Sequence, residues 1–184
     1  MSENSKKNGP FEILSTKIVY QNPWIRVRED SVIRPGGSSG IFGIVEMVSG
    51  SSVLPITKDG MVYLVSEHKY GIERESLEVI SGALDSNETP LDGAIRELQE
   101  ELGLTAGKWT ELGVVDPFTT VIRSPNFMFL AEDLRSGPSN PDEGEEVYAV
   151  KYPLVDALNM VMSGKITHSA SCVLILKAAR ILGQ

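Results

Sequence analysis

Residues 81–104 read Ser-Gly-Ala-Leu-Asp-Ser-Asn-Glu-Thr-Pro-Leu-Asp-Gly-Ala-Ile-Arg-Glu-Leu-Gln-Glu-Glu-Leu-Gly-Leu, a glycine-led loop followed by an amphipathic segment. Thr89 is a good N-cap, Pro90 suits the first helical position, and Asp92 can complete a capping box. Gly103 stands where a left-handed C-terminal residue is favoured. The stretch therefore predicts a helix from about Pro90 to Leu102, whose apolar stripe consists of Leu91, Ala94, Ile95, Leu98 and Leu102.

Three carboxylates, those of Glu97, Glu100 and Glu101, share about one third of the circumference of this helix, on the side away from the apolar stripe. Like charges at such spacings repel each other, and no lysine alternates with them to relieve the repulsion. One interpretation is a solvated acidic face. The other is a site for a hard divalent cation, because Mg²⁺ prefers carboxylate oxygens together with waters and substrate phosphates.

The surrounding spacing favours the metal site. Gly82, Glu88 and the run Arg-Glu-Leu-Gln-Glu-Glu-Leu-Gly-Leu over residues 96–104 resemble the signature of the Nudix hydrolases at every defined position. That signature is long and specific, so a chance match is very improbable. We therefore call residues 82–104 the Nudix box.

The resemblance implies a role for each polar residue of the box. Its Mg²⁺ ligands would be Glu97 and Glu101, with Glu100 as an auxiliary ligand and the backbone carbonyl of Ser81 completing the set; Mn²⁺ is the alternative ion. Arg96 would order the catalytic site together with Glu88, since arginine can bridge carboxylates bidentately. An ordinary surface ion pair is the alternative for these two residues. Gly82 and Gly103 would have structural roles in the box and would not contact metal or substrate.

The composition excludes several classes of protein. The chain has 184 residues, of which 41% are hydrophobic, so it can form one full domain or a domain with a small extension. Its net charge of −8 argues against binding nucleic acid, and its single cysteine, Cys172, excludes an intrachain disulfide. No segment resembles a signal peptide or a membrane span. We therefore expect a cytoplasmic protein that binds neither nucleic acid nor membranes.

The N-terminal quarter has a strand-like pattern. Residues 1–10 are polar and predict a disordered lead, whereas residues 11–48 predict a small antiparallel β subdomain that is too thin to bury itself. This subdomain resembles the N-terminal strands of the ADP-ribose pyrophosphatase branch, which implies a homodimer. Trp24 is the candidate for stacking on the nucleotide base. A tryptophan that fills the core of the subdomain is the alternative.

The segment before the box carries further candidates. Ser52–Ile56 and Met61–Ser66 flank Asp59-Gly60, whose sequence predicts a hairpin. Lys69 stands where the branch usually has an arginine, and it would contact a phosphate as a point charge. Beyond the box, Pro117 resembles a marker of the branch, although Phe118 replaces the usual glycine. Arg123 either contacts a phosphate or is a solvated surface residue.

The C-terminal part begins with an acidic, turn-rich loop over residues 137–146. In the branch that it resembles, a glutamate of this loop completes the active site, and Glu143 and Glu145 are the two candidates here. A strand over residues 147–153 and helices over 155–162 and 169–182 follow. The second of these helices should turn four residues inward: Val173, Leu174, Leu176 and Ile181.

These patterns predict an α/β fold, a Nudix α/β/α sandwich with a mixed sheet over residues 49–184, preceded by the β subdomain. The implied activity is Mg²⁺-dependent hydrolysis of a nucleoside diphosphate sugar, with ADP-ribose favoured over GDP-mannose, to a nucleoside monophosphate and a sugar phosphate. Hydrolysis of nucleoside triphosphates or RNA 5′ ends is one alternative, and a non-catalytic ligand sensor is another. Only His68 and His168 are present, and neither suggests a catalytic triad.

Overall fold

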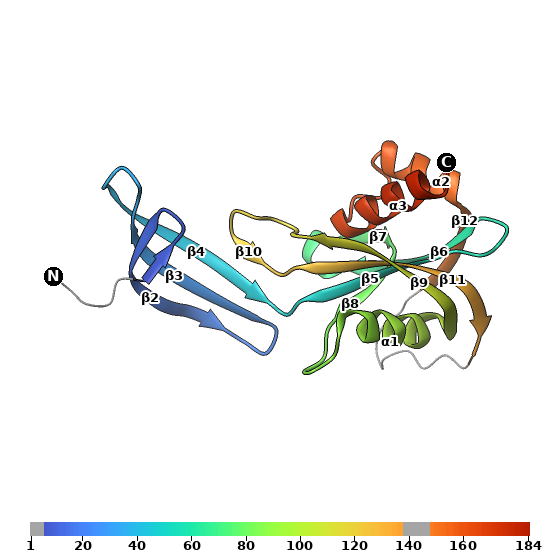
Figure 1. Ribbon diagram of the computed structural model, residues 1–184, viewed down its shortest axis with the longest axis horizontal. Helices are drawn as coiled ribbons and strands as arrows, with labels where there is room; N and C mark the ends of the chain where they lie inside the picture. Colours follow the sequence, from blue (N-terminus) through green and yellow to red (C-terminus); the bar gives the residue numbers. More distant parts are fainter. Residues whose placement is uncertain (1–5, 138–147) are drawn as a thin grey trace. The chain divides into compact units, whose positions relative to one another are not determined.

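The computed structural model describes residues 6–137 and 148–184. The chain divides into two compact units, residues 1–48 with 116–124 and residues 49–115 with 125–184 (Figure 1). We expected residues 116–124 in the hydrolase domain. By their contacts they group with the first unit, because strand β10 (Ile122–Arg123) pairs in parallel with β4 (Ser39–Met47).

The first unit is a single sheet whose described strands follow the order β1-β2-β3-β4-β10. The three strands that precede β4 are β1 (Lys6–Asn8), β2 (Phe11–Gln21) and β3 (Ile25–Ile33). The expected disordered lead is wrong for residues 6–8, which pair with the start of β2. Gly9 permits the tight turn between these two strands, since its φ of 55° lies in the left-handed region.

The central sheet of the second unit mixes parallel and antiparallel pairs. Its strands lie in the order β8-β5-β11-β9; they are β5 (Gly50–Pro55), β8 (Ile80–Ala83), β9 (Leu104–Val115) and β11 (Asn126–Ser136). The pair β5 and β11 is parallel, whereas β8 and β9 pair antiparallel on either side. Strand β5 is buried on both faces, which explains its apolar run without alternation.

A smaller sheet has the order β12-β6-β7, with β6 (Met61–Lys69), β7 (Arg74–Glu78) and β12 (Tyr148–Pro153); the 3-10 turn η1 (Tyr70–Ile72) joins β6 to β7. The predicted Asp59-Gly60 turn forms, but the hairpin does not extend beyond one bridge between Ile56 and Val62. The hairpin prediction is wrong because both edges of β5 are taken by β8 and β11, so that β6 lies in another sheet.

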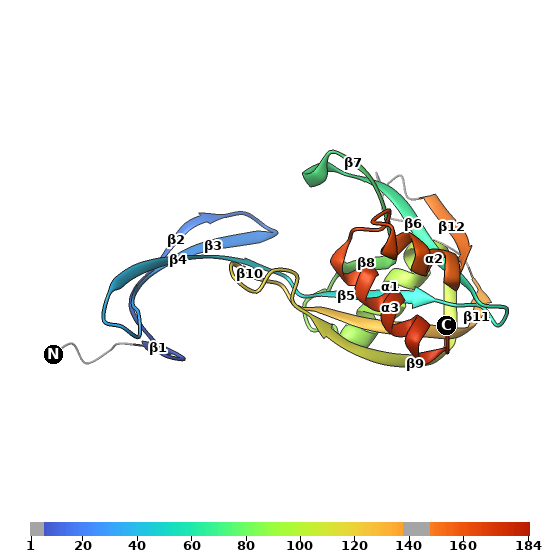
Figure 2. The same ribbon diagram turned by 90° about the horizontal axis from the view of Figure 1, so that it is seen from above.

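Helices cover both faces of the central sheet. Helix α1 (Pro90–Leu102) lies on one face, and α2 (Leu154–Met162) and α3 (Ser169–Ile181) lie on the other (Figures 1 and 2). Successive residues of β5 alternate between the two layers: Val53 belongs to the core under α1, and Leu54 to the core under α2 and α3. The predicted α/β/α sandwich with a mixed sheet is confirmed.

The inward face of α3 differs from the predicted one. Leu174 is fully buried and Val173 packs against the core, but Leu176 and Ile181 are exposed. The residues of α3 that fill the core in their place are Ile175, Ala178 and Ala179. None of the described helices is long and apolar enough to cross a membrane.

Candidate functional site

The box helix α1 has the ends that its sequence predicts. The hydroxyl oxygen of Thr89 accepts a hydrogen bond from the Asp92 amide at 3.2 Å, and Pro90 occupies the first turn. At the other end, Gly103 has a φ of 60°, and its N–H donates to the carbonyls of Gln99 and Leu98. The helix therefore runs from Pro90 to Leu102 as expected.

The apolar stripe of α1 is narrower than predicted. Ala94 and Leu98 are fully buried, whereas Leu91 and Ile95 are each 37% exposed. Gly93 is buried in their place. A Cβ at this position would lie 2.5 Å from Cδ2 of Leu84, the first residue of the preceding loop, so a larger residue at position 93 would displace the Leu84 side chain.

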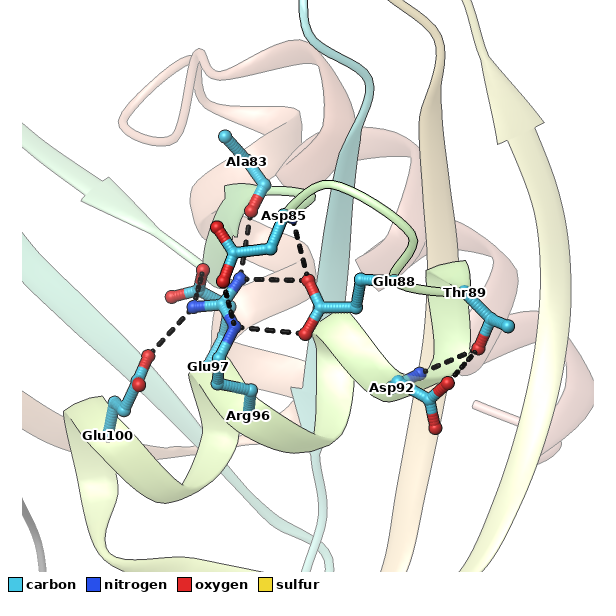
Figure 3. Close-up of polar contacts among 8 residues, drawn as sticks. All are labelled: Ala83, Asp85, Glu88, Thr89, Asp92, Arg96, Glu97 and Glu100. Atoms are coloured by element: carbon cyan, nitrogen blue, oxygen red, sulfur yellow. Dashed lines mark hydrogen bonds and ion pairs between the residues drawn. The ribbon is translucent and has the colours of Figure 1, made fainter.

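Arg96 holds this loop against the helix (Figure 3). Its Nε lies 3.0 Å from Glu88 Oε1, and its Nη2 donates both to Glu88 Oε2 at 3.2 Å and to the carbonyl of Ala83 at 2.9 Å. The side chain of Glu88 is only 13% exposed, and its Oε2 also accepts a hydrogen bond from the Asp85 amide. Arg96 of α1 thus bonds both the loop, through Glu88, and the end of β8, through the Ala83 carbonyl. An ordinary surface ion pair would join only two side chains.

The same guanidinium also contacts two of the predicted metal ligands. Arg96 Nη1 lies 2.8 Å from Glu97 Oε1 and 2.8 Å from Glu100 Oε2. The hydrogen bond from Arg96 lowers the pKa of Glu88, against the opposing effect of burial. In turn, Glu88, Glu100 and Glu97 together raise the pKa of Arg96, with Glu88 contributing most. Arg96 therefore stays charged in a strongly acidic setting.

Glu97 lies directly against the backbone where β8 ends. A Cβ built on Gly82 would meet Glu97 Oε1 at 1.9 Å, so no larger residue fits there while Glu97 keeps its position. Ser81 precedes Gly82 on β8 and pairs with Ser52 of β5. The absence of a side chain at Gly82 thus brings a carboxylate close to the strand that carries the predicted carbonyl ligand.

The donor set in this region fits a hard divalent cation. Ser81 offers a carbonyl oxygen, and Glu97, Glu100 and Glu101 offer carboxylates, which are oxygen ligands of the type that Mg²⁺ prefers. Within residues 6–137 and 148–184, no three acidic, histidine or cysteine side chains are already drawn together around one point. Arg96 Nη1 instead supplies the positive charge between the carboxylates of Glu97 and Glu100.

The candidate loop bases lie beyond what the structure describes. Glu143 and Glu145 fall within residues 138–147, outside the described part of the chain. The residue before this segment is placed, however: the N–H of Gly137 donates to the carbonyl of Gly103 at 2.6 Å. The acidic loop therefore begins at the C-terminal end of the box helix.

The predicted substrate contacts are Lys69, Trp24 and Arg123, and each is placed within its own unit. Lys69, at the end of β6, donates a hydrogen bond to Glu67. Trp24 belongs to the first unit and is 74% exposed, so the alternative that it fills the subdomain core is wrong. The Asn22 side chain accepts hydrogen bonds from the amides of Trp24 and Ile25, which fixes the turn. Arg123 is exposed, with Glu46 at 3.7 Å.

The sequence did not predict the contact between one pair of ionisable residues, Glu78 and His168. Glu78 of β7 is buried, and its Oε2 lies 3.2 Å from Nδ1 of His168, at the start of α3. The available signal was a charged residue inside the apolar strand run Leu-Glu-Val-Ile over residues 77–80. A carboxylate in such a run is rarely buried without a partner. The sequence does not reveal which partner that is.

Comparison with known proteins agrees with this geometry. Residues 48–171 match the NUDIX domain, and residues 11–45 match the nucleoside diphosphate sugar hydrolase N-terminal domain. The chain belongs to the Nudix hydrolase family. A crystal structure of an ADP compounds hydrolase has the same fold, with a TM-score of 0.84 at 21% identity, covering 99% of this chain and 97% of the other.

Two bacterial relatives narrow the assignment within the family. The ADP-ribose pyrophosphatase of Bacillus subtilis is 31% identical over 156 residues, which cover 80% of this chain and 81% of the relative. That of Mycobacterium tuberculosis is 28% identical over 162 residues, covering 86% and 78%. The chain is accordingly a Nudix pyrophosphatase of the ADP-ribose pyrophosphatase branch.

Proposed function

We propose that this protein hydrolyses the diphosphate bond of a nucleoside diphosphate sugar, with ADP-ribose as the preferred substrate and Mg²⁺ as the metal. The products are a nucleoside monophosphate and a sugar phosphate. The observation that carries the proposal is the contact of Glu97 with the Gly82 backbone, in a chain whose residues 11–45 match the N-terminal domain of nucleoside diphosphate sugar hydrolases.

In this proposal the box residues hold the metal. Glu97 and Glu101 are the principal ligands, Glu100 is auxiliary, and the Ser81 carbonyl completes the set. Bound Mg²⁺ supplies charge neutralisation of the diphosphate and an acidified water to such a reaction. The overall acidity of the chain supports a metal requirement, since a net charge of −8 repels an anionic substrate unless cations offset it.

Protein side chains then position the substrate and take a proton. Lys69 contacts a phosphate oxygen, and either Glu143 or Glu145 accepts a proton from the attacking water, a contribution of about 10²–10⁴-fold. Trp24 stacks on the nucleotide base; its exposed indole supports this role. Arg123 is a second candidate phosphate contact, although its neighbour Glu46 competes for its charge.

We also propose that the protein is a cytoplasmic homodimer. The sheet of the first unit leaves large apolar side chains exposed on β2 and β4, among them Leu14, Tyr20 and Ile41. An apolar surface of this kind on a thin sheet is typical of an interface, and a second copy of the chain is the occupant proposed here. The single cysteine of the chain suits a reducing compartment.

The experiment that tests the substrate is a turnover panel. Phosphate-coupled assays with Mg²⁺, and in parallel with Mn²⁺, compare ADP-ribose, GDP-mannose, ADP-glucose and UDP-glucose with ATP and a 5′-triphosphate RNA. We expect ADP-ribose to have the highest kcat/KM. A preference for a triphosphate or RNA would refute the proposed substrate class, and the absence of turnover with every compound would favour a ligand sensor.

A further inference from the structure

The buried carboxylate of Glu78 calls for a physical explanation. Its side chain is only 9% exposed, and carboxylates are almost never this buried unless they are paired. In the antiparallel ladder Glu78 stands opposite Val65 of β6. Because alternate residues of a strand share one face, Glu67 and Lys69 lie on the same face of this sheet as Glu78.

On one side, Glu78 is held from the start of α3. Nδ1 of His168 lies 3.2 Å from Glu78 Oε2 and 2.8 Å from Oγ of Ser171. The Ser171 oxygen in turn accepts a hydrogen bond from the amide of Val79, the residue after Glu78, at 3.0 Å. Nδ1 and the Ser171 oxygen can each donate to the other, depending on the tautomer. A carboxylate can only accept, so a proton on Nδ1 is the tautomer that makes the contact with Glu78 attractive.

The imidazole does this without adding a charge of its own. Burial lowers the pKa of His168; the Glu78 carboxylate opposes this effect, and Lys69 reinforces it. At neutral pH, His168 is therefore uncharged beside Glu78. Its Nδ1 contacts the carboxylate at 3.2 Å and leaves the negative charge of Glu78 in place.

On the other side, Glu78 belongs to the acidic surroundings of Lys69. Burial disfavours the charged ammonium, but the hydrogen bond to Glu67 and the charges of Glu78, Glu67 and Glu101 outweigh burial and raise the pKa of Lys69. Two carboxylates of the same sheet face thus compete for one ammonium. Glu67 already accepts a hydrogen bond from Lys69, whereas Glu78 contacts His168.

We infer that His168 is a positioning residue for the active site: by holding Glu78, it keeps N–H donors of Lys69 available for a phosphate oxygen of the substrate. An ammonium has three donors, and one of them donates to Glu67. When His168 no longer holds Glu78, this carboxylate closes on Lys69 and occupies the donors that the phosphate needs. The inference rests on the proposed phosphate contact of Lys69.

The test compares His168→Leu with His168→Asn. Leucine removes the donor, whereas the asparagine amide nitrogen can replace Nδ1 and should restore the contact with Glu78. For His168→Leu we expect KM for the nucleoside diphosphate sugar to rise about tenfold or more, the range for one lost charge-assisted hydrogen bond. The value of kcat should change little, because the lost contact contributes equally to substrate and transition-state binding. His168→Asn should have nearly the wild-type KM.

A second readout needs neither substrate nor metal. Acetic anhydride acetylates accessible lysine amines, and peptide mass spectrometry measures the extent at each site. In His168→Leu, acetylation of Lys69 should fall several-fold, while that of Lys58, which is 88% exposed, should stay constant. His68→Leu is the matched control, because His68 also stands near a glutamate, Glu75 at 3.6 Å, but is exposed.

The outcomes separate this inference from the proposed function. Unchanged acetylation of Lys69 in His168→Leu, or equal impairment of the leucine and asparagine variants, overturns the inference whatever the enzyme cleaves. Reduced acetylation in a protein that cleaves no nucleoside diphosphate sugar overturns the proposed function alone. If His168→Leu does not fold, His168→Gln, whose amide extends toward the position of Nε2, takes its place with the same expected rise in KM.

Discussion

The substitution Arg96→Met should lower the free energy of unfolding by about 2–3 kcal/mol. Methionine keeps much of the length of arginine but carries no donor, so the variant loses the contacts with Glu88, Glu97, Glu100 and the Ala83 carbonyl. An exposed ion pair is worth about 0–1 kcal/mol, and breaking a buried one costs about 3–5 kcal/mol. Because Arg96 is 27% exposed and Glu88 is 13% exposed, the expected loss lies between these limits.

Urea-induced unfolding at pH 7 measures this loss, with linear extrapolation to water. The chain has two tryptophans, and a Trp24→Phe background leaves Trp109 as the reporter of the second unit. Arg96→Lys should lose about half as much stability, since an ammonium cannot form a bidentate contact. Lys58→Met is the matched control. Lys58 is 88% exposed, and its Nζ lies 3.6 Å from Asp133 Oδ1. Losing this exposed ion pair should change the free energy of unfolding by less than about 0.5 kcal/mol.

The effect of Arg96→Met should also depend on pH. The pKa of Glu88 is lowered in the folded protein, so its contribution to stability is complete above the unfolded value of about 4.3 and is lost as the pH falls through the folded value. The wild type should therefore lose more stability than Arg96→Met as the pH falls from about 5 to about 3. A difference below about 0.5 kcal/mol at pH 7, or one that does not shrink on acidification, would refute the reasoning.

Three further predictions concern the metal site, the acidic loop and the oligomer. Glu97→Gln and Glu101→Gln should each reduce turnover by about 10²-fold or more while the protein still folds, and Gly82→Ala should reduce turnover likewise because its Cβ displaces the Glu97 carboxylate; full activity in both glutamine variants contradicts the metal assignment. Single substitutions of Glu143 and Glu145 by glutamine should separate the base from the bystander, with a loss of about 10²–10⁴-fold for the base; normal turnover in the double variant excludes the loop from catalysis. Light scattering at micromolar concentration should give the mass of a dimer, and a monomer at that concentration contradicts the proposed interface.

Local signals predicted the box helix well, and non-local pairing explains most of the errors. Thr89, Pro90 and Gly103 act within one turn of their own positions, so the helix ends could be read from the sequence. The Asp59-Gly60 turn was equally local. The strands on either side of this turn, β5 and β6, lie in different sheets, because β5 pairs with β8 and β11. A turn sequence specifies the turn but not the edges at which the strands finally pair.

The candidate site shows the same division. Glu88 and Arg96 are eight residues apart and belong to one motif, so their contact could be expected. Glu78 and His168 come from a strand and a distant helix, joined through a hydrogen bond from Val79 to Ser171 that spans 92 positions in sequence. No periodicity links such residues, since their proximity depends on how α3 packs on the sheet.

The hydrogen bond from Gly137 to Gly103 bears on how such enzymes can diversify. This hydrogen bond fixes the start of the acidic loop at the C-terminal end of the box helix. Six residues separate Gly137 from Glu143 in the sequence, and a chain of six residues spans at most about 20 Å. At its other end the loop enters β12, which is anchored on β6. Insertions and deletions between these two anchor points can thus alter the reach and chemistry of the loop while the box helix keeps its geometry. The contact between Gly137 and Gly103 thus separates a segment whose length can change from the helix that carries the box carboxylates.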